Sequence, residues 1–167
     1  MIDEQKSCIQ PHHRSCLAIV YIPPAIGPGA PSDHRQLHHE YAQEEHPWRW
    51  GWQQDMVTVL DEDLDWTGPA ADRPGFQRLG RMIAEGCVGL VCVAALCHLS
   101  RSRTMLLAFL QACRHAGTLV AVNGRLIDLA RFPANDYTQR LYQLTAAYYR
   151  DLTHLFEEVD RLLEDSD

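Results

Sequence analysis

Two polar loops hold the side chains with which this chain could do chemistry. Both lie between Asp61 and Ser102, where Arg73 follows one apolar run and His98 and Arg101 follow the next. Loops at strand ends are where an α/β domain usually carries its functional residues. Guanidinium and imidazole groups bind phosphate oxygens, so one hypothesis is a phosphate- or nucleotide-binding module that uses Arg73, His98 and Arg101.

The six cysteines and nine histidines do not form a metal-ligand pattern. No two cysteines make a CxxC pair. The histidine pairs His12-His13 and His38-His39 are adjacent, so their members would not share one face of a helix. Several cysteines lie in or beside an apolar run, which indicates reduced, buried thiols. We therefore expect neither a metal nor a cofactor.

Composition argues against several classes of protein. The chain has 15 basic and 22 acidic residues, a net charge of −7. This balance disfavours binding of nucleic acid through the overall field of the protein. No window approaches 18 uninterrupted apolar residues, so no membrane span is expected. The polar N-terminus lacks the apolar core of a signal peptide, which favours a cytoplasmic protein.

The elements that must position the polar loops can be read from apolar periodicity. Five apolar runs predict strands at residues 16–22, 56–60, 88–94, 118–122 and 126–127. Helices are predicted over residues 34–46, from an N-cap at Asp72 to Gly86, and from Ser102 to Gly117. This alternation predicts an α/β domain with a mostly parallel central sheet of four or five strands, flanked by helices. The run at 88–94 is the most apolar, so we expect it to be central.

The last part of the chain has a different period. Apolar residues recur there at spacings of three and four, namely Leu141, Leu144, Tyr148, Leu152, Leu155, Val159 and Leu162. The pattern predicts a C-terminal helix of nearly 30 residues whose second half packs against another chain in a homo- or hetero-oligomer. The alternative is a helix that folds back on its own sheet. The predicted organisation is a flexible segment 1–14, an α/β domain 15–133 and a dimerisation helix 134–167.

Three sequence runs carry a resemblance to a known family. They are residues 61–79 (DEDLDWTGPAADRPGFQRL), 86–102 (GCVGLVCVAALCHLSRS) and 117–124 (GTLVAVNG), followed by Asn135-Asp136 at the start of the long helix. In order and spacing they resemble the catalytic domain of the serine recombinases, the resolvase/invertase family, over most of residues 17–156. The resemblance implies a resolvase-type fold with a long helix that pairs subunits. It also implies an activity in which a serine attacks a DNA phosphate, arginines stabilise the charge and no metal is needed.

The nucleophile of that family is missing from the matching position. Its first strand typically ends Tyr-x-Arg-x-Ser, where the serine is the nucleophile. Here Tyr21-Ile22-Pro23-Pro24-Ala25 occupies that place, so the arginine position holds Pro23 and the serine position holds Ala25. Ser32, seven residues further along a Pro/Gly-rich loop, is the alternative nucleophile.

The other motif positions are partly kept. Thr67 matches a serine of the family, and Arg73 and Arg101 match active-site arginines, whereas His98 replaces an arginine. The resemblance therefore implies a residual phosphate or anion site made of Thr67, Arg73, His98 and Arg101.

These positions predict a catalytically inactive, recombinase-like protein that acts through dimerisation or protein partners, with DNA recombination as the process it would modulate. In the family the long helix leads through basic residues to a DNA-binding domain. Here the residues from Arg150 to Asp167 include seven acidic and two basic side chains, so we expect DNA to bind weakly or through a partner. The alternatives are an active recombinase or nuclease with Ser32 as nucleophile, and the phosphate-binding module.

Overall fold

A computed structural model describes residues 6–24, 47–66, 68–69, 72–93, 96–100, 102–122 and 124–131. All of them belong to the first of two compact units, Met1–Arg131, and the second unit is Phe132–Asp167. The helix expected over residues 34–46 and the dimerisation helix expected over 134–167 lie outside the described residues.

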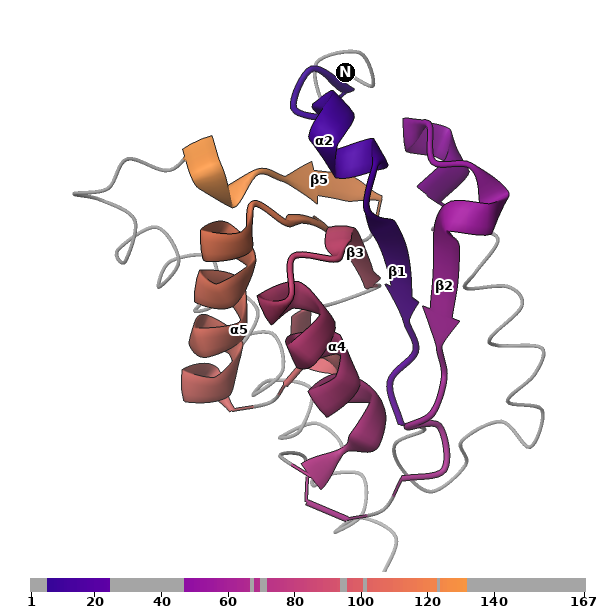
Figure 1. The fold of residues 1–167 in the computed structure, drawn as a ribbon. Helices are drawn as coiled ribbons and strands as arrows, with labels where there is room; N and C mark the ends of the chain where they lie inside the picture. The colour runs from indigo at the N-terminus through magenta and orange to yellow at the C-terminus, as the bar shows by residue number, and fades with distance from the viewer. Residues whose placement is uncertain are drawn as a thin grey trace, which may run out of the picture. The chain divides into compact units, whose positions relative to one another are not determined.

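The predicted strands form one five-stranded sheet (Figure 1). They are β1 (Leu17–Tyr21), β2 (Val57–Leu60), β3 (Val88–Val93), β4 (Leu119–Val122) and β5 (Arg125–Ile127). The order is β2-β1-β3-β4-β5, and only the β4–β5 pair is antiparallel. All six residues of β3 are buried, because helices and neighbouring strands cover a central parallel strand on every side. The mostly parallel sheet and the central place of β3 are therefore confirmed.

Two helices cover one face of this sheet side by side, α4 (Pro74–Ala84) and α5 (Arg103–Ala116) (Figure 1). The Ser102 hydroxyl accepts a hydrogen bond from the Met105 N–H at 3.4 Å and caps α5. Gly117 ends that helix with a left-handed φ of 73°, which glycine adopts without strain. The predicted bounds of α5 are confirmed.

A short helix, α2 (Pro11–Arg14), lies against β3 at the amino ends of the parallel strands (Figure 1). Ile9 and His13 are buried there, at 7% and 6% exposure. The flexibility of residues 1–14 stays a prediction, although the part from residue 6 onward contributes these two side chains to the core. No helix among the described segments has the length and apolar character to cross a membrane.

The tryptophan-rich segment closes the same end of the core. Trp50 and Trp52 are buried, whereas Trp48 is 62% exposed. The Trp52 indole N–H donates to the Cys16 carbonyl at 3.0 Å. Two of the three tryptophans of this segment therefore belong to the core.

Gly89 of β3 leaves the space in which α2 packs. A Cβ atom on Gly89 would lie 2.0 Å from the His13 carbonyl oxygen. We expect Gly89→Ala to lower the free energy of unfolding by about 1–3 kcal/mol, because the helix must move away from the sheet. Chemical denaturation followed by circular dichroism measures this change.

Gly80 of α4 provides a control of opposite sign. No atom lies within 4 Å of a Cβ added there, so Gly80→Ala should raise stability by about 0.5–1 kcal/mol through helix propensity. Equal effects of the two substitutions would contradict close packing of α2 on β3.

Candidate functional site

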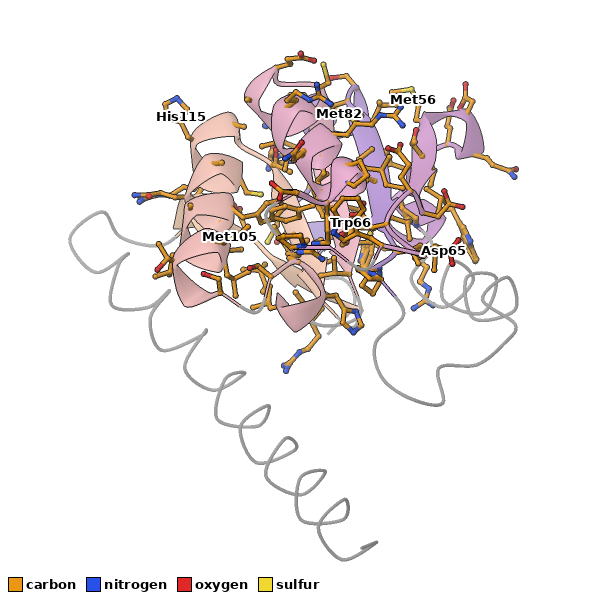
Figure 2. All side chains as sticks on the ribbon, turned by 90° about the horizontal axis from the view of Figure 1, so that it is seen from below. Met56, Asp65, Trp66, Met82, Met105 and His115 are labelled. Atoms are coloured by element: carbon orange, nitrogen blue, oxygen red, sulfur yellow. The ribbon has the colours of Figure 1, made fainter. Side chains whose placement is uncertain are left out.

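Four polar residues of the described part of the chain lie at the carboxyl ends of β1, β2 and β3, namely Tyr21, Asp63, Arg73 and His98. Tyr21 is the last residue of β1, and Asp63 lies in the turn after β2. Arg73 directly precedes α4, and His98 ends the short 3₁₀ helix η4 (Leu96–His98) after β3. Figure 2 looks onto this edge of the sheet, with Asp65 and Trp66 of the loop after β2 in view. The parallel topology explains why loops so far apart in sequence meet here.

Asp63 is the most completely buried charged residue of this edge, with no exposed surface. Its carboxylate accepts hydrogen bonds from the backbone N–H groups of Gly75 and Phe76, at 2.7 and 2.9 Å. These groups belong to the first turn of α4, whose N–H groups lack partners within the helix. Asp63 therefore caps α4 from the end of a neighbouring strand, where its negative charge also favours the helix dipole.

The N-cap expected at Asp72 is wrong. The capping position is Arg73, and its side chain makes no capping hydrogen bond. Asp72 is exposed, because the loop brings Asp63 under the helix end instead. Pro74 begins the helix as expected, since its missing N–H is not needed in the first turn.

Tyr21 links Asp63 to Arg73. Its hydroxyl donates to Asp63 Oδ2 at 2.6 Å and accepts from Arg73 Nη1 at 3.1 Å. Burial, and then the hydrogen bond to Asp63, raise the pKa of Tyr21 well above its usual range. The phenol therefore stays protonated, and its hydroxyl bridges the buried Asp63 carboxylate and the buried Arg73 guanidinium.

Arg73 is buried at 5% exposure and directs its donors into the protein. Besides Tyr21, its guanidinium donates to the carbonyl oxygens of His98, at 3.2 Å, and of Leu99. The guanidinium carbon lies 5.0 Å from the centre of the Phe76 ring, within the range of a cation–π contact. This geometry makes Arg73 a brace that fastens the loop after β3 to β1 and to the start of α4.

The backbone carbonyl of His98 accepts a hydrogen bond from Arg73, but the His98 ring takes no part in that contact. Within the described part of the chain, its Nδ1 atom is buried and has no hydrogen-bond partner. Burial lowers the pKa of His98 below its usual value, so the ring is neutral at pH 7. A neutral imidazole carries no charge with which to attract a phosphate.

Several predicted site residues lie outside the described residues. They are Ala25, Ser32, Thr67, Arg101 and the seven apolar positions Leu141, Leu144, Tyr148, Leu152, Leu155, Val159 and Leu162. Of the predicted anion site, the structure describes only Arg73 and His98, which share one hydrogen bond. The anion site as a whole stays a prediction. Within the described ranges, no three histidine, cysteine or acidic side chains gather as metal ligands would.

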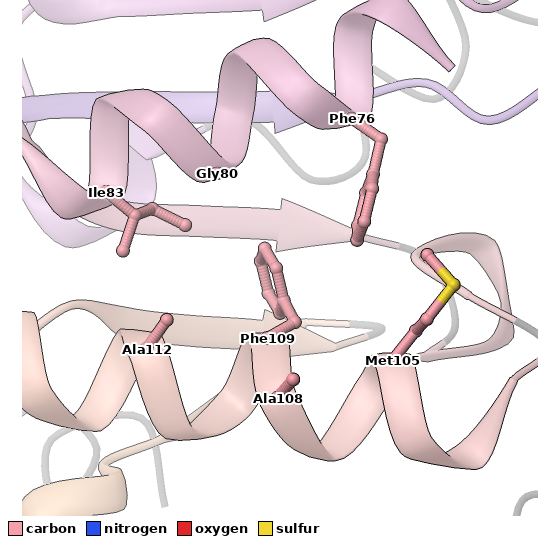
Figure 3. Close-up of a pocket in the computed structure, with 7 residues that line it drawn as sticks. All are labelled: Phe76, Gly80, Ile83, Met105, Ala108, Phe109 and Ala112. Carbon is pink, nitrogen blue, oxygen red and sulfur yellow. The ribbon is translucent and has the colours of Figure 1, made fainter. Parts of the chain in front are cut away.

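An apolar groove lies between α4 and α5 (Figure 3), and it is lined in part by Phe76, the ring that the Arg73 guanidinium contacts. Its volume is about 240 Å³, and it is lined by Phe76, Gly80, Ile83, Met105, Ala108, Phe109 and Ala112. The Phe76 and Phe109 rings face each other across it with centres 5.6 Å apart. The lining side chains are apolar, so the groove offers no side chain that would bind a phosphate.

Sheet order, helix placement and the polar edge define a mostly parallel α/β domain with its candidate site at the carboxyl ends of the strands. The model of the family "Resolvase, N terminal domain" matches residues 31–156, which is most of the chain. The protein belongs to this family, as the sequence runs predicted.

Solved structures similar to this chain include two catalytic domains and the product of a transposon reading frame. The catalytic domain of TP901-1 integrase has 23% identity and a TM-score of 0.49, covering 81% of this chain and 97% of that one. The first open reading frame of transposon ISC1904 from Sulfolobus solfataricus P2 has 18% identity and a TM-score of 0.47, covering 90% and 98%. The catalytic domain of ISC1926 TnpA, an IS607-like serine recombinase, has 15% identity and a TM-score of 0.48, covering 87% and 97%. A comparison with curated protein sequences finds no match.

Proposed function

We propose that this resolvase-family protein is catalytically inactive and acts in DNA recombination through contacts with other protein chains. The observation that carries the proposal is Ala25, which stands where the family motif has its serine nucleophile. An alanine side chain has no atom that can attack a phosphate. Loss of the nucleophile lowers the rate of a well-studied hydrolase by about 10⁶, and charge stabilisation alone does not restore it.

The environment of the remaining polar residues supports the same proposal. Pro23 supplies no charge at an arginine position. Arg73 donates to Tyr21 and to two backbone carbonyls inside the protein, and the His98 ring is neutral at pH 7. Positions 23, 73 and 98 therefore present less positive charge to a phosphate than three outward-facing arginines would.

The catalytic test uses supercoiled plasmid DNA. We expect the protein to form no covalent adduct with the DNA and to leave no nicks, because a phosphoserine link needs a nucleophile at position 25. Denaturing gel electrophoresis of labelled DNA detects such an adduct. The Ser32→Ala variant is the matched control. An adduct that forms with the unmodified protein and disappears in Ser32→Ala would establish the displaced nucleophile instead.

The proposed protein contacts rest on the apolar seam of residues 141–162. We expect the protein to be oligomeric in solution and Leu152→Glu with Leu155→Glu to convert it to a monomer, because two buried charges would disfavour a helix pair. Light scattering after size-exclusion chromatography measures the mass. Gln143→Glu, which adds a charge outside the seam, should leave the oligomer intact. A monomeric unmodified protein, or an oligomer that survives both leucine substitutions, would contradict the seam as the interface.

A further inference from the structure

Two cysteines stand opposite each other at the amino ends of β1 and β3. In the parallel register Leu17 pairs with Val88, and the Leu17 N–H donates to the Cys87 carbonyl at 2.9 Å. Cys16 and Cys87 directly precede these two residues, so extending the register by one residue sets them opposite each other. Neighbouring strands lie about 4.8 Å apart, within the Cα separation of about 4.4–6.8 Å that a disulfide needs.

The Cys16 thiol already points toward the segment that carries Cys87. Its Sγ atom lies 3.5 Å from the carbonyl oxygen of Gly86, the residue next to Cys87. Hydrogen bonds hold both backbones, since the Cys16 N–H donates to His13 and the Cys87 N–H donates to Met82, each at 3.1 Å. The Cys87 Sγ atom lies 3.9 Å from the Glu85 carbonyl oxygen, so closing the pair requires rotation of both side chains and little movement of the backbone.

Accessibility separates this pair from the core cysteines. Cys87 is exposed and Cys16 is partly exposed, whereas Cys92 and Cys113 are buried. Burial also raises the pKa of the Cys113 thiol to about 12, which keeps it in the unreactive protonated form. The prediction of buried thiols is thus right for Cys92 and Cys113 and wrong for Cys87, which lies on the surface just before its strand begins.

We propose that Cys16 and Cys87 form a disulfide when the protein meets a hydroperoxide. The more exposed Cys87 sulfur attacks the peroxide oxygen, the O–O bond breaks, and Cys87 becomes a sulfenic acid as one water forms with the thiol proton. The Cys16 sulfur then attacks the Cys87 sulfur, the S–O bond breaks, and a second water leaves. Two thiols lose two electrons in total, and one hydrogen peroxide is reduced to two waters.

The disulfide would join the starts of β1 and β3, at the sheet edge opposite the candidate site. It closes a long loop between residues 16 and 87, and such a cross-link restricts the unfolded chain. We expect oxidation to raise the melting temperature by about 5–10 °C, an effect that a reducing agent reverses. This inference does not depend on the proposed function, because it uses no residue of the polar edge.

The test treats the purified full chain with hydrogen peroxide and maps the disulfides by mass spectrometry of unreduced peptides. The expected result is a peptide linked through Cys16 and Cys87, together with the rise in melting temperature. Cys8→Ser should keep both effects, and Cys87→Ser should lose both. A disulfide that uses Cys8 or Cys97, a cross-link between two chains, or oxidation of Cys87 to a sulfinic acid without any disulfide would overturn the proposal.

Discussion

Replacing Arg73 by methionine is expected to lower the free energy of unfolding by about 3–5 kcal/mol, the usual effect of removing one partner from a buried charge pair. Methionine fills a similar volume and has no donor. The carbonyl oxygens of His98 and Leu99 would lose hydrogen bonds. Asp63 would keep its charge in an interior that no longer holds the guanidinium linked to it through Tyr21. Urea denaturation followed by tryptophan fluorescence measures the loss.

Arg78 provides the matched control, since it is an arginine within α4, five residues after Arg73, in a different environment. Its ion pair with Glu62 is on the surface, where the two side chains are 49% and 37% exposed. Exposed pairs contribute about 0–1 kcal/mol, so Arg78→Met should change stability little. A stability loss in Arg73→Met no larger than that in Arg78→Met would show that Arg73 does not brace the fold.

The contacts of Arg73 account for an arginine at this edge whether or not the protein is catalytic. The Arg73 side chain contacts three separate segments, the end of β1, the start of α4 and the loop after β3. None of these contacts involves the position at which we propose that the nucleophile is missing. The loss of catalysis that we propose would therefore leave the structural role of Arg73 intact.

The fold could be predicted from the sequence because each element carries a strong local signal. The run from Val88 to Val93 is apolar at nearly every position, and Ser102 and Gly117 are the residues that ordinarily begin and end a helix. The parallel order follows from the helix-length connections between successive strands. These features depend on neighbours in the sequence, which is why their bounds agree with the structure within one or two residues.

The arrangement of the candidate site could be predicted only in part. The sequence places Tyr21, Arg73 and His98 at strand ends, but it does not show that the Arg73 guanidinium turns inward. That direction depends on carbonyl groups of the loop at residues 98 and 99, which lie 25 and 26 positions away. In the sequence, Asp63 is one of three consecutive acidic residues, Asp61, Glu62 and Asp63, and nothing local distinguishes it from the other two. Asp63 caps α4 because β2 pairs with β1 and the turn after β2 lies at the first turn of α4. This arrangement depends on three elements that are distant in sequence, so a local sequence pattern does not predict it.

Asp63→Asn tests this relation, and we expect it to lower the free energy of unfolding by about 2–4 kcal/mol. The carboxylate accepts three hydrogen bonds, from Tyr21 and from the N–H groups of Gly75 and Phe76. An asparagine amide offers one oxygen and directs its NH₂ group at donors that need an acceptor. It also removes the negative charge that balances Arg73 through Tyr21. Thermal unfolding should show the loss as a fall in melting temperature of roughly 4–16 °C.

Asp72→Asn makes the same chemical change nine residues later, at the position where the sequence predicts the cap. Asp72 is exposed and does not occupy the capping position, so we expect a change within about 0.5 kcal/mol. A double variant of Asp63→Asn with Arg73→Met should lose less stability than the sum of the two single changes, because each change alone leaves the other charge buried without its partner. If the losses of the double variant add, the link from Asp63 to Arg73 contributes little to stability. If Asp72→Asn destabilises the protein more than Asp63→Asn does, the cap of α4 is Asp72, as the sequence predicts.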